Sequence, residues 1–132
     1  MKIEHIGIAV RNLEVAVQQY EKLLGTPCYK RETVGSEKVN TAFLQTGDSK
    51  VELLEATDEE SVIAKYLEKK GEGMHHIALS VDDIDAEMVR LKGEGFNLLN
   101  EKPKRGADNK LVAFIHPKDC GGVLVELCQE RK

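Results

Sequence analysis

Two histidines and two glutamates occupy matching places in two similar stretches of this chain. His5 and His76 each open a short apolar segment, and Glu52 and Glu126 each stand between a valine and a leucine further along. Imidazole nitrogens and carboxylate oxygens are ligands that divalent first-row metal ions accept well. Four such ligands in an octahedral shell leave two adjacent positions open, which could chelate a substrate that offers two oxygens. The set therefore predicts one divalent metal site.

Other interpretations of the histidines and glutamates are weaker. A single histidine on a strand is more often a core or surface residue than a ligand, but four such residues at equivalent places favour the metal site. An extradiol-type oxygenase needs a three-ligand facial site with more open positions, so that chemistry fits less well. His75 neighbours His76 on the opposite strand face, so we expect it to be structural, whereas His116, in a His-Pro-Lys loop, is a candidate for contact with the substrate.

Strand alternation explains how a cavity could form beside the histidines, because successive side chains of a strand point to opposite faces. One face of each predicted strand is aliphatic and suits packing against a helix. The other face carries a histidine beside small residues, namely His5, Gly7 and Ala9 in the first stretch and His76, Ala78 and Ser80 in the second. Small neighbours leave a hollow beside the imidazole. Burying two glutamates there without a cation would be costly.

The two stretches belong to an internal repeat, which indicates how the chain is organised. Four features recur at an offset of 71: residues 5–10 with 76–81, Asn12 with Asp83, Leu13 with Ile84, and residues 42–44 with 113–115. Residues 51–53 and 125–127 match at an offset of 74. Three residues must therefore be inserted after Ile115, and residues 119–122 are the predicted place.

Local patterns predict an α+β fold of two tandem modules. The expected strands are 3–10, 39–45 and 50–54, with a helix from Leu13 that Gly25 ends, a linking helix over 58–70, and room for further strands near 28–34 and 96–100. Acids at the start of the linking helix and lysines at its end match the helix dipole. We expect a single domain over residues 1–132, with module one at about 1–56 and module two at about 73–130.

Composition excludes several classes of protein. The chain has 132 residues, of which 41% are apolar and 32% charged, as in ordinary globular proteins. The net charge of -4 disfavours nucleic acid or an anionic membrane as the partner. The apolar run near residue 1 is too short for a signal peptide, and no run approaches about 20 apolar residues, so we expect neither a signal peptide nor a membrane span. Three cysteines without a CxxC spacing argue against disulfides or a thiolate zinc site, and we expect a cytoplasmic protein.

With these residues identified, the whole sequence resembles the vicinal oxygen chelate (glyoxalase/bleomycin resistance) superfamily. Within that superfamily it is most similar to the methylmalonyl-CoA epimerase family. The most specific stretches are HIGIAV at 5–10, KVELLEA at 50–56, GMHHIALSVDDIDA at 73–86, and VAFIHPKDCGGVLVELCQ at 112–129. The last of these, with HPK followed by GGVLVEL, favours the epimerases over other members.

The resemblance implies paired βαβββ modules that form a cupped mixed sheet around a metal site, and interconversion of (R)- and (S)-methylmalonyl-CoA. His5, His76 and Glu126 fall on ligand positions of the family, and Glu52 falls on a ligand position that is glutamine in some members. The implied ion is cobalt, with manganese, nickel or zinc as alternatives, and a homodimer is expected. Some members carry a catalytic glutamate on the strand before that fourth ligand, but residues 39–43 (VNTAF) hold no acid.

Epimerisation removes the proton at carbon 2 from one face and returns a proton to the other. A divalent metal would act as a Lewis acid for the enolate, and a base must serve each face. We expect Glu126 and Glu52 to be these bases. Basic residues that cluster in one loop-rich stretch could hold the CoA phosphates or the free carboxylate, with Lys118 first, then Lys104 and Arg105, beside Lys102 and Lys110.

Two alternatives stay open. A glyoxalase I-like lyase would share the His-Glu-His-Glu ligand set and would use a thiol adduct, but the HPK…GGVLVEL stretch weighs against it. A non-catalytic binding module of the same fold would not need all four ligands. The sequence leaves open whether the modules pair within one chain or by swapping between chains.

Overall fold

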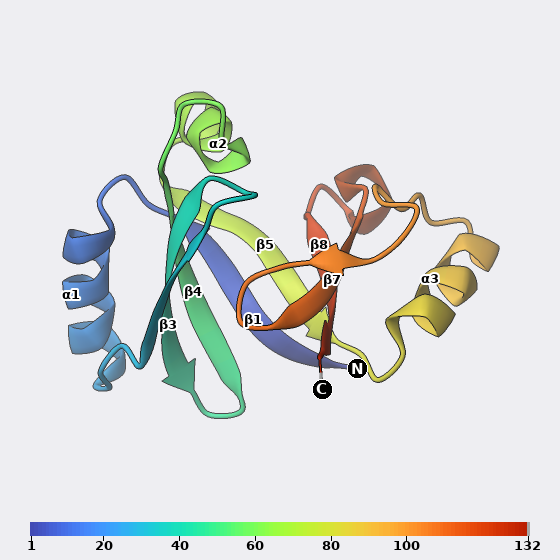
Figure 1. The fold of residues 1–132 in the computed structure, drawn as a ribbon, viewed down its shortest axis with the longest axis horizontal. Helices are drawn as coiled ribbons and strands as arrows, with labels where there is room; N and C mark the ends of the chain where they lie inside the picture. Colours follow the sequence, from blue (N-terminus) through green and yellow to red (C-terminus); the bar gives the residue numbers. More distant parts are fainter. Residues whose placement is uncertain (132) are drawn as a thin grey trace. The chain divides into compact units, whose positions relative to one another are not determined.

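The computed structural model describes residues 1–131. It divides into two compact units, His5–His75, called the first unit here, and Met1–Glu4 together with the residues from His76 onward, called the second unit. Each unit is built around four strands, in the order β2-β3-β4-β1 in the first and β5-β8-β7-β6 in the second (Figure 1). The predicted α+β class and the βαβββ plan of each module are confirmed.

The first module runs through β1 (Lys2–Ala9), α1 (Leu13–Leu24), β2 (Lys30–Val34), β3 (Val39–Thr46) and β4 (Ser49–Ala56), and α2 (Val62–Lys70) follows. β1 pairs with β4 in parallel, and β3 pairs antiparallel with both β4 and β2. Asn12 caps α1, because its side chain accepts a hydrogen bond from Val15 N at 3.1 Å. Gly25 ends the helix in the left-handed conformation, with φ of 68°.

The second module repeats this order with β5 (Gly73–Ser80), α3 (Ile84–Gly93), β6 (Lys104–Arg105), β7 (Lys110–Ile115) and β8 (Val125–Glu130), and a 3₁₀ helix, η1 (Pro117–Cys120), stands before β8. β5 pairs with β8 in parallel, and β7 pairs antiparallel with β8 and β6. Asp83 caps α3 by accepting from Ala86 N at 3.0 Å. The two modules therefore have the same order of elements and the same pattern of parallel and antiparallel strand pairing.

The largest hydrophobic cluster of each unit lies between α1 or α3 and one face of the strands, and Figure 1 shows each of these helices beside the strands of its own unit. Leu53 of β4 and Leu127 of β8 are fully buried in these clusters. A matching hydrogen bond also connects the first residue of α1 and of α3 to a strand of the same unit. Glu55 accepts from Leu13 N at 2.8 Å, and Gln129 accepts from Ile84 N at 2.7 Å.

The predicted insertion is confirmed. Leu44 pairs with Val51 across β3 and β4, 7 positions on, whereas Ile115 pairs with Val125 across β7 and β8, 10 positions on. η1 occupies the extra length, and Gly121 ends it with φ of 64°. A tight hairpin in the first unit is thus replaced by a helical turn in the second.

Two predicted elements were wrong in detail. The linking helix begins at Val62 rather than at residue 58, because Ser61 is its N-cap and the acids 58–60 form a turn before it. No regular strand forms over residues 96–100, where only Leu98 makes an isolated bridge. Two backbone hydrogen bonds connect this segment to the end of β7: Leu99 N donates to Phe114 O, and His116 N donates to Asn97 O, each at 2.8 Å. Side chains take part on either side of them, because Asp119 accepts from Asn97 N and Asn100 accepts from Phe114 N. The edge strand of the second unit is β6 instead.

The expected module boundaries stay a prediction, although α2 lies within the first unit. Among the described residues, no helix combines the length and the apolar character that crossing a membrane requires.

Candidate metal centre

The first unit brings His5 of β1 and Glu52 of β4 together. Their closest atoms, Nε2 and Oε1, are 3.2 Å apart, and the two residues are only 5% and 4% exposed. In the strand register Glu52 lies between Gly7 on one side and Phe43 on the other. Gly7 brings no side chain to this row beside the carboxylate, and the hollow expected from the strand alternation stays a prediction.

The second unit brings His76 of β5 and Glu126 of β8 together in the same way. Nε2 and Oε1 are 3.5 Å apart, and the two residues are 5% and 6% exposed. Glu126 lies between Ala78 and Phe114 in the register, and the Phe114 ring meets the imidazole edge-on at 6.3 Å. Each unit therefore holds one buried His–Glu pair between a small residue and a phenylalanine.

Alternation on the strands sets the direction of both glutamates. Leu53 and Leu127, one residue after each glutamate, lie in the cores under α1 and α3. Glu52 and Glu126 must therefore point to the opposite face of their strands, which we call the inner face of each unit. The histidines share these inner faces.

The chemistry of each pair fits a divalent metal ion. Two ligand atoms about 2.1 Å from one ion are about 3.0 Å apart in an octahedral shell and about 3.4 Å apart in a tetrahedral one. The separations of 3.2 and 3.5 Å match this range. They also match an ion pair, so the burial of both carboxylates is the stronger argument, because burial without a cation is costly. Each buried His–Glu pair is therefore a candidate for metal ligation within its own unit.

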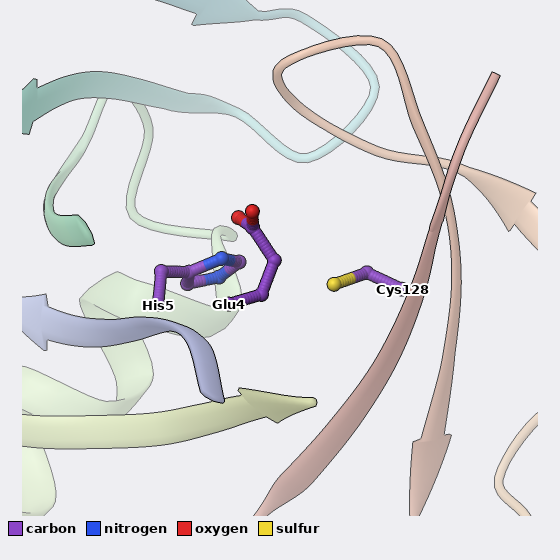
Figure 2. Close-up of side chains that lie close together, drawn as sticks. All are labelled: Glu4, His5 and Cys128. Atoms are coloured by element: carbon purple, nitrogen blue, oxygen red, sulfur yellow. The ribbon is translucent and has the colours of Figure 1, made fainter. Parts of the chain in front are cut away.

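Two further side chains of the second unit that could ligate a metal ion were missed by the sequence reasoning. The Cys128 thiol and a carboxylate oxygen of Glu4 lie within 4.8 Å of each other, and both residues are buried (Figure 2). Cys128 stands two residues after Glu126, so strand alternation alone could have placed its thiol on the inner face. The thiol donates to Leu79 O at 3.6 Å.

The other two histidines have local roles in the structure. The His75 ring meets Tyr66 edge-on at 5.1 Å, which agrees with the expected structural role. His116 is exposed, and its Nδ1 accepts a hydrogen bond from Lys118 N at 3.1 Å, so it caps η1. A contact of His116 or Lys118 with a substrate stays a prediction.

The basic residues of the loop-rich stretch differ in the strand face on which they lie and in their burial. The Lys104 ammonium lies 5.7 Å from the centre of the Phe114 ring, on the inner face of the second unit. Arg105 is paired with Leu111, which packs in the α3 core, so Arg105 belongs to the opposite face. Lys110 is buried beside Glu130, at 3.9 Å. Lys104 is thus the basic residue of this hairpin that lies beside the ring next to Glu126.

Two pKa shifts belong to the inserted loop. The hydrogen bond from the Asn97 backbone N–H holds the pKa of the Asp119 carboxyl below its ordinary value. Burial raises the pKa of the Cys120 thiol, which keeps it protonated and unreactive near neutral pH. All three cysteines are free, as expected.

Comparisons with known proteins show the family to which this chain belongs. The model of the Glyoxalase/Bleomycin resistance protein/Dioxygenase superfamily matches residues 4–114. Human mitochondrial methylmalonyl-CoA epimerase is 43% identical over 97% of this chain and 73% of its own length. The crystal structure of methylmalonyl-CoA epimerase from Mycobacterium tuberculosis matches with a TM-score of 0.94 and 38% identity, over 99% of this chain and 89% of that one.

A structure of a variant methylmalonyl-CoA epimerase from Streptomyces coelicolor, in complex with 2-nitronate-propionyl-CoA, matches with a TM-score of 0.93 and 38% identity. The match covers 100% of this chain and 99% of that one. The relatives thus include enzymes of known name and one that holds an acyl-CoA analogue. This chain belongs to the glyoxalase/bleomycin resistance protein/dioxygenase superfamily and, within it, to the methylmalonyl-CoA epimerase family of enzymes.

Proposed function

We propose that this chain interconverts (R)- and (S)-methylmalonyl-CoA by moving the proton at carbon 2. The observation that carries the proposal is the matched pair of buried His–Glu couples, one on each inner face. Two carboxylates in equivalent surroundings suit a reaction in which a proton leaves one face of a carbon and returns to the other. The names of the relatives support the same substrate.

We infer that His5, Glu52, His76 and Glu126 hold one divalent ion between them, with cobalt as the expected metal and manganese, nickel or zinc as alternatives. Such an ion would supply Lewis-acid stabilisation of negative charge on the acyl oxygens. The imidazoles would bind in their neutral form through Nε2, the nitrogen that faces the carboxylate in each pair.

Glu126 and Glu52 would transfer the protons, each as a ligand that can loosen from the ion and act as a base. One carboxylate takes the proton from carbon 2, and the other, already protonated, gives its proton to the opposite face of the enolate. The glutamates thereby exchange protonation states, which exchange with solvent restores. A free glutamate is a weak base, with a pKa of about 4.3, so the reaction depends on acidification of the substrate and on burial of the carboxylate. Both carboxylates are more than nine-tenths buried.

The anionic parts of the substrate need basic partners. Lys104, beside Phe114 and on the same face as Glu126, is the best-supported candidate for the free carboxylate or a CoA phosphate. Lys118, His116 and Arg105 stay predictions for the same task. The expected homodimer and cytoplasmic location also stay predictions.

The test is proton exchange at carbon 2. Protein loaded with Co²⁺ is incubated with (R)-methylmalonyl-CoA in deuterated water, and deuterium at carbon 2 is followed by mass spectrometry together with formation of the (S) epimer. The proposal expects both, well above a control without protein. No exchange above that control would refute it. Turnover of the methylglyoxal–glutathione hemithioacetal instead would favour the lyase alternative, and an inert, metal-free protein would favour a binding module.

A further inference from the structure

Thr41 on β3 carries the one buried side-chain oxygen or nitrogen among the described residues that has no hydrogen-bond partner. The residue is 1% exposed, and its Oγ1 has no hydrogen-bond partner among the described residues of the chain. Removing a hydroxyl from water without a new hydrogen bond costs free energy, and native proteins rarely leave such a group unpaired. A group of this kind needs an explanation outside the packing of the chain.

The position of Thr41 on β3 relates it to the candidate metal ligands of the same unit. Thr41 pairs with Leu54 across β4, one row from the pair formed by Phe43 and Glu52. Diagonal neighbours of this kind lie about 7–8 Å apart and share a face. The adjacent residue Ala42 packs in the α1 core, so Thr41 points to the inner face, where Glu52 lies.

The repeat provides a control for this position. Val112 stands at the equivalent place in the second unit, paired with Cys128 across β8, and packs there in an apolar cluster. Valine has nearly the shape of threonine, with a methyl in place of the hydroxyl. The same strand packing is therefore achieved in this chain without a hydroxyl, so packing alone does not require Thr41.

We propose that the Thr41 hydroxyl donates a hydrogen bond to the acyl-group oxygen that gains negative charge when the proton leaves carbon 2. The proposal rests on the proposed function. A bound acyl group that reaches Glu52 extends over the neighbouring row of β3. The residue facing Thr41 on edge strand β2 is Glu32, whose side chain is 32% exposed and paired with Lys30 at 3.8 Å. Lys30 and Glu32 are half-buried, and the proposal requires their side chains to turn aside as the substrate enters.

The role assigned to Thr41 is a hydrogen-bond donor and not a base, because a hydroxyl does not ionise near neutral pH. A hydrogen bond to an oxygen that becomes charged strengthens in the transition state. Its loss should therefore lower kcat more than it raises KM. Substrate binding through the CoA moiety would be largely unaffected.

The test compares Thr41→Val, Thr41→Ser and the matched control Val112→Thr, using Co²⁺-loaded full-length protein and methylmalonyl-CoA. Thr41→Val should lower kcat/KM about 10- to 100-fold, mainly through kcat, since hydrogen bonds to charged groups are worth that factor. Thr41→Ser, which keeps the hydroxyl, should recover most of this loss. Val112→Thr should leave kcat/KM within about twofold of wild type.

Thermal unfolding separates a binding role from a structural one. Thr41→Val removes an unpaired buried hydroxyl, so its Tm should equal or exceed that of wild type by up to about 6 °C, whereas Val112→Thr should lower Tm. Unchanged activity in Thr41→Val overturns the proposal for Thr41 and leaves the proposed function standing. A loss of activity that comes with a lower Tm also overturns it. Absence of exchange in the wild-type protein overturns both.

Discussion

The inner faces of the two units are alike around the histidine and the glutamate and differ one row away. In both, the glutamate lies between a small residue and a phenylalanine, and the histidine is within 3.5 Å of it. In the next row the first unit has Thr41 beside Leu54, and the second has Val112 beside Cys128. The edge strands differ in charge, with Glu32 facing Thr41 and Lys104 facing Val112.

This difference corresponds to an asymmetry of the proposed substrate. Methylmalonyl-CoA presents two oxygens that are similar in position, but one belongs to a thioester and the other to a carboxylate. Matching His–Glu pairs suit the two similar oxygens and the two faces of carbon 2. The neighbouring rows differ, with the Thr41 hydroxyl and Glu32 in the first unit and Val112 and Lys104 in the second. This difference suits a substrate that has a thioester at one end and a carboxylate at the other. A repeat can thus keep its candidate metal ligands equivalent while its neighbouring rows diverge.

Replacement of the glutamates should give the largest effect and tests whether the two are equivalent as bases. Glu126→Gln and Glu52→Gln should each lower exchange from one epimer about 10²- to 10⁴-fold, the usual contribution of a general base. Deuterium uptake from pure (R) and pure (S) substrate measures each direction. Full epimerase activity in Glu52→Gln would mean that Glu52 is only a ligand and that the two faces use different groups.

Truncation of the two central leucines tests the equivalence of the cores. Leu53 and Leu127 are both fully buried, so Leu53→Ala and Leu127→Ala should each cost about 2–5 kcal/mol in the free energy of unfolding. Denaturant unfolding monitored by circular dichroism gives both values. A loss below about 1 kcal/mol in one variant alone would show that the cores are not packed alike.

Neutralising Lys104 should have a smaller effect, confined to substrate binding. Lys104→Gln should raise KM about two- to fivefold with little change in kcat, the range expected of an exposed charge pair. Lys92→Gln is the matched control, because this exposed lysine in the last turn of α3 lies on the opposite side of the second unit. An equal rise of KM in both variants would mean that the net charge of the protein, and not a contact of Lys104 with the substrate, causes the effect.

The smallest effect concerns the insertion that only the second unit has. Because the pKa of Asp119 is lowered in the folded protein, its carboxylate contributes stability above its ordinary pKa near 4, and this contribution is lost as pH falls through the lowered value. Asp119→Asn should therefore lower Tm at pH 7 by more than at pH 3. A difference that is the same at both pH values would contradict the assigned role of the Asn97 hydrogen bond.

Sequence reasoning succeeded where local rules decide the structure. Apolar alternation set the direction of His5 and Glu52, and the side-chain caps at Asn12 and Asp83 placed both helices. It failed where contacts between distant segments decide. Near residues 96–100 only an isolated bridge forms instead of the expected strand, and the Asn100 and Asp119 side chains accept hydrogen bonds from Phe114 N and Asn97 N. The unpaired hydroxyl of Thr41 becomes visible only when every neighbour is known.

The central claim is that two equivalent His–Glu pairs hold a single ion, and metal stoichiometry tests it most directly. Native mass spectrometry of the full chain titrated with Co²⁺ should show one ion per chain in the wild type. His5→Ala and His76→Ala should each weaken binding of that ion by at least about 100-fold, because each removes a ligand of the same site. Two ions per chain in the wild type, with one surviving in each variant, would mean that the pairs bind metal separately and would contradict the account.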